Sequence, residues 1–190
     1  MEELKERILK EGKFIKPDIL KVDSFLNHMV DAKLLRNIAM EFKKAFSSEN
    51  ITKIVTIESS GISIAAFCAY EFGVPFVFAK KYNATNLDPD CFCAEVFSFT
   101  KQTTSNIRIS KKYITKDDNV LIIDDFLANG KAILGLYDII RQAGAKLAGC
   151  GIVIEKSFQP GRKILDDMGI KVVSLARISS IEGGKISFLD

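Results

Sequence analysis

Several residue types that mark specialised proteins are scarce or absent in this chain. Among its 190 residues there are no tryptophans, one histidine and four cysteines. A single histidine, His28, excludes the metal sites that take two or more histidine ligands. The cysteines lack the paired C-x-x-C spacing of a zinc site, so we expect reduced thiols and no structural metal. The four cysteines are Cys68, Cys91, Cys93 and Cys150.

Long hydrophobic runs and an excess of one charge are also missing. No stretch of about 18 apolar residues is present, and residues 1–6 are charged rather than apolar, unlike a signal peptide. The 27 Lys and Arg residues against 24 Asp and Glu leave a net charge of +3, too small and too scattered for a nucleic-acid surface. We therefore expect a cytoplasmic protein that binds neither membranes nor nucleic acids. Its length and its 47% hydrophobic content fit one domain over residues 1–190.

Strand-like and helix-like segments alternate along the chain. Apolar periodicity predicts helices at residues 2–11, 31–46, 62–72, 131–142 and 162–168. Strands are expected at residues 54–57, 75–79, 92–99, 106–110, 120–124, 147–155 and 172–176, with an edge strand at 185–189. Residues 14–28 give no regular pattern and are expected to be irregular. This alternation predicts an α/β fold with a doubly wound, mostly parallel sheet and right-handed crossovers.

Two carboxylates follow the most apolar of these strands. Asp124 and Asp125 end the run that begins at Val120, at the carboxyl end where open α/β sheets bind their ligands. A charged carboxylate rarely lies in a core without a partner. Residues 128–132 then lead into a helix, whose first backbone N–H groups can hold an anion. The pattern predicts a ribose-phosphate site, unless the acids merely end a strand and Asn129 or Gly130 caps the helix.

A second strand-to-helix junction repeats this arrangement at Glu58, Ser59, Ser60 and Gly61. It is either another anion site or a helix capped by serine. Lys80 and Lys81, expected just past the next strand, are either ligands for the same anion or solvated surface residues.

Lys156 closes a later strand and should reach the ligand face, because its neighbour Glu155 must point to the opposite face. A lysine donates hydrogen bonds and accepts none, so it suits the carbonyl of an oxopurine and not the amino group of adenine.

These motifs resemble the type I phosphoribosyltransferases. The resemblance rests on Leu20 to His28 (LKVDSFLNH), Lys53 to Ile62 (KIVTIESSGI), Asp124 to Gly130 (DDFLANG) and Ile154 to Gly161 (IEKSFQPG), and it is strongest to the members that act on xanthine. One departure is the lack of Ser or Thr between residues 128 and 132, where many members place hydroxyl groups on the phosphate. Backbone amides, Asn129 and Lys131 would take over that role.

The resemblance implies a role for each part of the site. Asp124 and Asp125 are implied to be the catalytic pair that holds the ribose hydroxyls, and the loop around pyrophosphate is implied to contain a non-proline cis peptide. A hood at about residues 12–30 would cover the base, and a mobile lid at about residues 82–108 would exclude water. The implied contacts with 5-phosphoribosyl 1-diphosphate (PRPP) are Ala128, Asn129, Gly130, Lys131 and Ala132 at the phosphate, and Glu58, Ser59, Ser60, Gly61, Lys80 and Lys81 at the pyrophosphate. Those with the base are Leu20, Asn27 and Lys156, while Phe126 either packs on the purine or is a core residue.

The resemblance also implies partners and a reaction. It implies a homodimer that converts xanthine and PRPP to xanthosine 5'-monophosphate and pyrophosphate, with Mg²⁺ bound mainly through PRPP. Two alternatives stay open at this stage. One is a phosphoribosyltransferase for adenine, hypoxanthine or guanine. The other is a regulator that senses PRPP or purines, although such repressors add an N-terminal DNA-binding domain for which the single short helix before Gly12 leaves no room.

Overall fold

The computed structural model describes residues 1–16, 19–81, 90–98, 103–182 and 185–189. The strands of its main sheet are β3 (Lys53–Ile57), β4 (Phe76–Lys81), β5 (Cys91–Ser98), β6 (Thr103–Ser110), β7 (Asn119–Leu127), β8 (Lys146–Lys156), β9 (Val172–Glu182) and β10 (Lys185–Phe188). Within the described residues these eight strands follow the order β10-β9-β8-β7-β3-β4-β6-β5. The five central strands from β9 to β4 run parallel, and antiparallel strands lie at both edges. The predicted mostly parallel, doubly wound sheet is confirmed.

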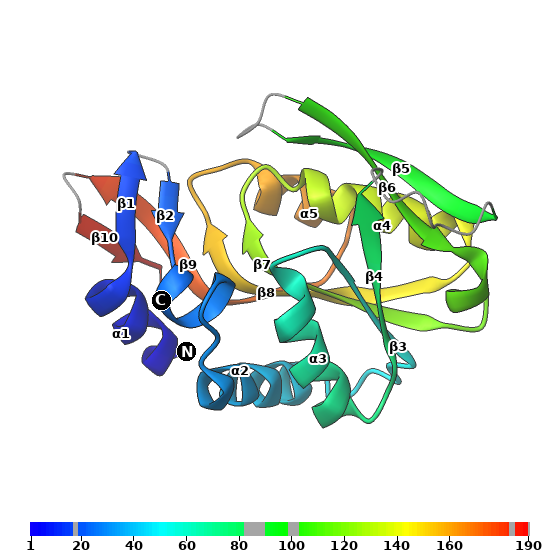
Figure 1. Cartoon of the computed structure of the whole chain (residues 1–190), viewed down its shortest axis with the longest axis horizontal. Coiled ribbons are helices and arrows are strands. Elements are labelled where there is room, and N and C mark those ends of the chain that lie inside the picture. Colours follow the sequence, from blue (N-terminus) through cyan, green and yellow to red (C-terminus); the bar gives the residue numbers. More distant parts are fainter. Residues whose placement is uncertain (17–18, 82–89, 99–102, 183–184, 190) are drawn as a thin grey trace.

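Helices cover both faces of this sheet. The helices are α1 (Glu2–Glu11), α2 (Ala32–Ala45), α3 (Gly61–Phe72), α4 (Lys131–Gln142) and α5 (Gly161–Asp167). Figure 1 shows α2 and α3 on one side of the sheet and α4 and α5 on the other. A hydrophobic core lies on each face of the sheet, and strand β7 contributes to both. Leu121 and Ile123 belong to one cluster, and Val120 and Ile122 belong to the other. A strand buried on both faces has no polar alternation, which explains its continuous apolar run.

Helix α2 shows how closely sequence signals fix the helix bounds. Asp31 precedes it and accepts hydrogen bonds from the backbone N–H groups of Lys33 and Leu34, both at 3.1 Å. This is the usual chemistry of an N-cap residue. Leu34, Ile38 and other apolar residues of one face are fully buried against the sheet. The predicted helix at residues 31–46 is thus confirmed, with Asp31 as its cap.

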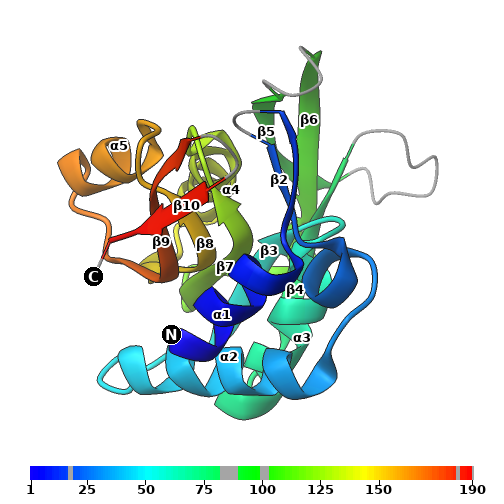
Figure 2. The same cartoon turned by 90° about the vertical axis from the view of Figure 1, so that its left-hand side faces the viewer.

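The N-terminal segment differs from the prediction. Residues 14–28 are not irregular: β1 (Lys13–Lys16) and β2 (Ile19–Lys21) form an antiparallel pair, and a single π-helical turn follows at Asp23–Asn27. An isolated pair of two short strands is only marginally stable, so its formation depends on the rest of the fold. The local sequence therefore gives little indication of it. Packing fixes the later part of this segment, because Leu20 of β2 and the fully buried Val22, Phe25 and Leu26 belong to the same cluster as α1 and α2. Figure 2 faces this end of the molecule and shows α1 directly above α2.

Two strands run further than their apolar residues indicated. Strand β7 continues to Leu127, because it pairs with β8 as far as the Leu127 and Glu155 register. Asp124 and Asp125 therefore lie inside the last part of the strand. Strand β4 continues to Lys81, so Lys80 and Lys81 belong to the strand instead of following it. In both cases backbone pairing with a neighbour continues where side-chain hydrophobicity ends.

The segment expected to form a lid is described only in part. Residues 91–98 and 103–110 form the hairpin of β5 and β6, which pairs with the end of β4 and packs on α4. Residues 82–89 and 99–102 of the expected lid lie outside the described residues. Movement of the lid stays a prediction.

Candidate active site

The acid pair at the end of β7 is largely buried and has no ion-pair partner among the described residues. Asp124 is 4% exposed, and its Oδ1 accepts a hydrogen bond from the backbone N–H of Asp125 at 3.0 Å. Oδ1 of Asp125 accepts from the backbone N–H of Phe126 at 2.9 Å. Burial raises the pKa of Asp124 well above its usual value, the charge of Asp125 raises it further, and Lys81 offsets little of this. A pair in this state is poised to accept hydrogen bonds from ligand hydroxyl groups.

Helix α4 begins beside this pair without a side-chain cap. Gly130 is its N-cap residue, with a φ of 76°, and makes no side-chain cap hydrogen bond. Of the two caps that the alternative named, Gly130 holds the cap position and Asn129 does not. The loop before α4 contacts the start of α5, where the backbone N–H of Gly161 donates to the carbonyl of Ala128 at 2.9 Å. A Cβ at Gly161 would lie 2.3 Å from that oxygen, so only glycine allows this contact. Residues Ala128 to Ala132 are thus held with their helix-start amides available to an anion.

The junction between β3 and α3 lies against the same acids. Ser60 is the N-cap residue of α3 and makes no side-chain cap hydrogen bond, which contradicts the alternative of a serine cap. A Cβ at Gly61 would lie 1.9 Å from Oγ1 of Thr56 and 3.4 Å from Oδ1 of Asp124, so the helix start sits directly on Asp124. The peptide between Glu58 and Ser59 is cis, as the family resemblance implied.

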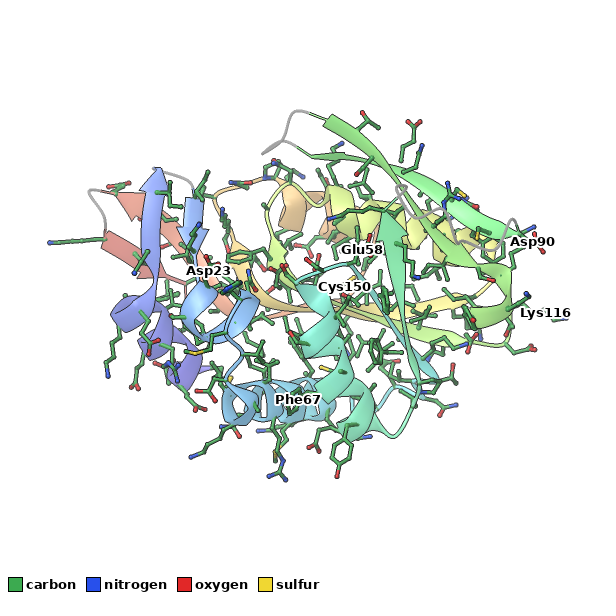
Figure 3. The ribbon with its side chains drawn as sticks, in the orientation of Figure 1. Asp23, Glu58, Phe67, Asp90, Lys116 and Cys150 are labelled. Atoms are coloured by element: carbon green, nitrogen blue, oxygen red, sulfur yellow. The ribbon has the colours of Figure 1, made fainter. Side chains whose placement is uncertain are left out.

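The Glu58 side chain has a defined partner. Its Oε1 accepts a hydrogen bond from the backbone N–H of Lys81 at 2.6 Å, which ties the loop to the end of β4. Figure 3 places Glu58 where the chain turns from β3 into α3. Ser59, Ser60 and Gly61 then complete the turn.

The two lysines of β4 point in different directions, as neighbouring strand residues must. Lys80 lines a cavity of about 590 Å³ between β4 and β6, together with Phe78 and Arg108. Neither aspartate of the acid pair lines that cavity. The charge of Lys81, in contrast, reaches Asp124 and lowers its pKa slightly. Lys81 is therefore the better placed of the two for an anion at the acid pair, and the role of Lys80 stays a prediction.

The last residues of β8 place an acid and a lysine on opposite faces of the strand. Glu155 is fully buried and accepts from Arg162 Nη2 at 2.6 Å and from Ser157 Oγ at 2.6 Å. Although burial alone would raise its pKa, these hydrogen bonds bring the pKa of Glu155 below its usual value. Lys156 points the other way, and its Nζ lies 5.6 Å from the centre of the Phe126 ring. The predicted opposite orientation of Glu155 and Lys156 is confirmed.

The hood reaches the acid pair through Asn27. Its Nδ2 donates to Oδ2 of Asp125 at 3.0 Å, across 98 residues of sequence. Its Oδ1 is buried and has no hydrogen-bond partner within the described part of the chain. Burial raises the pKa of Asp125, whereas the hydrogen bonds from Phe126 and Asn27 act in the opposite direction. Leu20, also in the hood, is 6% exposed and belongs to the same hydrophobic cluster as α1 and α2.

Sequence reasoning missed one polar group at this site. Thr56 of β3 is fully buried, and its Oγ1 has no hydrogen-bond partner among the described residues. It lies against Gly61, beside Asp124. The signal available in the sequence was a single hydroxyl residue in the otherwise apolar run from Ile54 to Ile57.

Two uncapped helix starts beside a buried acid pair, with a lysine and an amide nearby, suit a ligand that carries phosphate and hydroxyl groups. The chain belongs to the phosphoribosyl transferase family, whose domain matches residues 21–184. It is 57% identical over 190 residues to the xanthine phosphoribosyltransferase of Ruminiclostridium cellulolyticum, with 100% of both chains covered. It is 55% identical over 188 residues to that of Clostridium novyi, with 99% of both chains covered.

Solved structures agree with this assignment. The adenine phosphoribosyltransferase of Thermoanaerobacter pseudethanolicus is similar with a TM-score of 0.76 at 26% identity, over 93% of this chain and 98% of that one. The predicted type I phosphoribosyltransferase fold is confirmed. Among the described helices, none is long and apolar enough to span a membrane.

Proposed function

We propose that this protein transfers the 5-phosphoribosyl group of PRPP to xanthine, giving xanthosine 5'-monophosphate and pyrophosphate, in purine salvage. The observation that carries the proposal is the buried acid pair, unpaired by any described cation and touched by Asn27 of the hood. The full-length likeness to xanthine phosphoribosyltransferases supports the same base.

The chemistry is a displacement at C1 of the ribose. The bond between C1 and the pyrophosphate oxygen breaks, that oxygen keeps the electron pair, and a ring nitrogen of the base bonds to C1. Asp124 and Asp125 accept hydrogen bonds from the ribose hydroxyls and hold the ring in position, which favours the cationic character that develops on it. The uncapped start of α4 takes the 5'-phosphate, and the Ser59 to Gly61 loop with Lys81 takes the pyrophosphate.

Base selection follows from donors and acceptors. Lys156 donates to a carbonyl of the base and offers nothing to an amino group, which disfavours adenine. Asn27 offers both a donor and an acceptor to the edge that carries the extra carbonyl of xanthine. Phe126, under Lys156, forms the apolar side of the base pocket. Leu20 borders the same pocket from the hood.

The reaction proposed for this site would use a magnesium ion that comes with its substrate. No group of three or more His, Cys, Asp or Glu side chains that could hold a metal occurs among the described residues. Mg²⁺ keeps several waters and commonly binds through substrate phosphates, so PRPP would supply most of the ligands that do not come from the protein. It would supply positive charge to offset the negative charge of the departing pyrophosphate. Asp124 and Asp125 would contribute by orienting the ribose hydroxyls.

The proposal includes a homodimer in the cytoplasm and a lid that excludes water from the cationic ribose. Size-exclusion chromatography with light scattering tests the dimer. An outcome of one chain per particle at micromolar concentration contradicts it.

The test of the activity is pyrophosphate release from PRPP and Mg²⁺ with xanthine, guanine, hypoxanthine and adenine in parallel. We expect turnover with xanthine to exceed turnover with each other base by at least about tenfold. Preference for another base would show a different phosphoribosyltransferase. Absence of turnover with every base, together with retained PRPP binding in calorimetry, would favour a sensor of PRPP.

A further inference from the structure

The contact between Asn27 and Asp125 joins the part of the site that reads the base to the part that holds the ribose. Nδ2 of Asn27 donates to Oδ2 of Asp125 at 3.0 Å. The second oxygen of Asp125, Oδ1, accepts from the backbone N–H of Phe126 at 2.9 Å, which fixes the carboxylate in place. The donor and its acceptor are thus both held by elements of the fold, the π-helical turn and β7.

This contact decides which way the Asn27 amide faces. An ionised carboxylate accepts hydrogen bonds and cannot donate them, so it binds the NH₂ group of the amide and repels its oxygen. Oδ1 of Asn27 is consequently turned away from Asp125. It is buried without a partner in the described part of the chain, although buried acceptors are nearly always bonded. Such an oxygen is a candidate acceptor for a hydrogen atom of a ligand.

The direction of the amide matters because xanthine and guanine differ at one edge. At C2 and N3, xanthine presents a carbonyl acceptor next to an N–H donor. Guanine presents an amino donor next to a bare nitrogen acceptor, which is the reverse order. An amide that matches one base must therefore turn over by 180° about its last side-chain bond to match the other.

We propose that Asp125, beyond holding the ribose, is a specificity-positioning residue that fixes the Asn27 amide in the direction that accepts xanthine and rejects guanine. The inference rests on the proposed function, because it takes Asn27 as the residue that contacts the base. Under this inference the Asp125 carboxylate holds the ribose directly and positions the base through Asn27. Among the described residues Asp124 makes no such contact with the hood, and its Oδ1 lies at the backbone N–H of Asp125 and near the start of α3.

The experiment compares the binding of xanthosine 5'-monophosphate and guanosine 5'-monophosphate by titration calorimetry at mildly acidic pH, because the N3–H of the xanthine nucleotide is acidic and the argument needs that donor in place. Nucleotide products are used because their binding does not require turnover, so variants of the acid pair remain measurable. In Asp125→Ala the freed amide can turn over, and we expect the preference for the xanthine nucleotide over the guanine nucleotide to fall by about tenfold. In Asp124→Ala both affinities should fall, because ribose contacts are lost, while their ratio stays within about twofold of the wild-type ratio.

A double variant separates positioning from a general weakening of the site. In an Asn27→Ala background the amide is gone, so Asp125→Ala should no longer change the ratio of the two affinities. Asp125→Ser supplies a second test if the alanine variant melts at a lower temperature, because a hydroxyl both donates and accepts and does not impose one direction. We expect the preference of Asp125→Ser for the xanthine nucleotide over the guanine nucleotide to fall as well.

The possible results distinguish a failure of the role of Asp125 from a failure of the proposed function. A wild-type protein that prefers the xanthine nucleotide, with an Asp125→Ala ratio unchanged from wild type, overturns the role of Asp125 and leaves the proposed function standing. An Asp125 effect that persists in the Asn27→Ala background also overturns it, because the effect would not pass through the amide. A wild-type protein that shows no preference for the xanthine nucleotide overturns the proposed function and this inference together.

Discussion

Neighbouring strands of this sheet bury carboxylates near their carboxyl ends in two opposite ways. On β8, Glu155 is fully buried, yet hydrogen bonds from Arg162, Ser157 and Ser174 outweigh its burial and lower its pKa. On β7, Asp124 is almost as deeply buried and has no ion-pair partner among the described residues, so burial, together with the charge of Asp125, raises its pKa. Burial alone therefore does not separate the two acids. What separates them is whether the described part of the fold supplies their partners, as it does for Glu155, or leaves the partners to a ligand, as we propose for Asp124.

The largest effect should come from the unpaired acid. Asp124→Asn keeps the shape of the side chain and the hydrogen bond from the backbone N–H of Asp125, but it removes the negative charge. We expect kcat/KM with xanthine and PRPP to fall by about 10²–10³-fold, because a group aimed at the developing ribosyl cation is lost. Steady-state kinetics measures this. Asp167→Asn, which alters an exposed pair with Lys163, is the control and should retain full activity.

Glu155, the acid paired with Arg162, should affect mainly the stability of the fold. Glu155→Gln removes the charge that compensates Arg162 and should lower the free energy of unfolding by about 3 kcal/mol. Urea unfolding followed by circular dichroism measures the change. Asp167→Asn again serves as the matched control, since exposed ion pairs contribute about 0–1 kcal/mol. A Glu155→Gln protein as stable as wild type would show that the network on β8 is not what compensates the burial of the acid.

A smaller effect should follow at the loop that holds the phosphate. Gly161→Ala places a Cβ against the carbonyl of Ala128 and forces residues 128–132 away from the start of α5. We expect the KM for PRPP to rise by about tenfold with a smaller change in kcat, because a displaced cradle weakens binding. Gly169→Ala, at a position where a Cβ would meet no atom within 4 Å, is the control for changing a glycine. It should raise the KM for PRPP far less, although its φ of 71° makes some loss of stability expected.

The two acids should also give opposite dependences of stability on pH. The pKa of Asp124 is raised by folding, so its contribution is most favourable below its unfolded pKa and is lost as the pH rises through the folded value. Asp124→Asn should therefore be more stable than wild type by about 1 kcal/mol at neutral pH, with the difference closing near pH 4. The pKa of Glu155 is lowered, so its contribution is present above the unfolded pKa and is lost as the pH falls through the folded value.

Urea unfolding at several pH values between 4 and 8 tests both statements. In acid, the difference in the free energy of unfolding between wild type and Glu155→Gln should shrink, because wild type loses a favourable charge. The difference between wild type and Asp124→Asn should also shrink in acid, because wild type loses an unfavourable charge. Parallel curves for wild type and Asp124→Asn at all pH values would contradict the unpaired state of Asp124.

The sequence predicted most elements because their signals are local. The apolar run before Asp124, the Asp31 cap and the glycine after Phe72 each depend on residues within one or two turns. The prediction of residues 14–28 was wrong because β1 and β2 are too short to carry a pattern and depend on packing with α1 and α2. The strand bounds at Lys81 and Leu127 were too short because pairing partners set them, and a partner strand is not visible in a local window.

The sequence indicated candidate residues for the site but not the contacts between them. Asp124, Gly130 and Lys156 were recognisable from strand ends, helix starts and the family resemblance. The hydrogen bond from Asn27 to Asp125 joins residues 98 positions apart and depends on how the hood packs, so no spacing rule indicates it. The different directions of Lys80 and Lys81 followed from strand geometry once β4 was known to include them.

The packing of α1 has a consequence for how the protein is made. Leu4 and Ile8 of α1 are buried in the same cluster as Leu175 and Ile178 of β9, which is synthesised some time later at about 5–20 residues per second. Until β9 has been synthesised, α1 can pack on α2 but lacks the second surface that buries it. A chain that stops before β9 would therefore carry the acid pair and both helix starts beside an incompletely packed N-terminal segment. Under the proposed function, selection of the base would be the last property that the growing chain acquires.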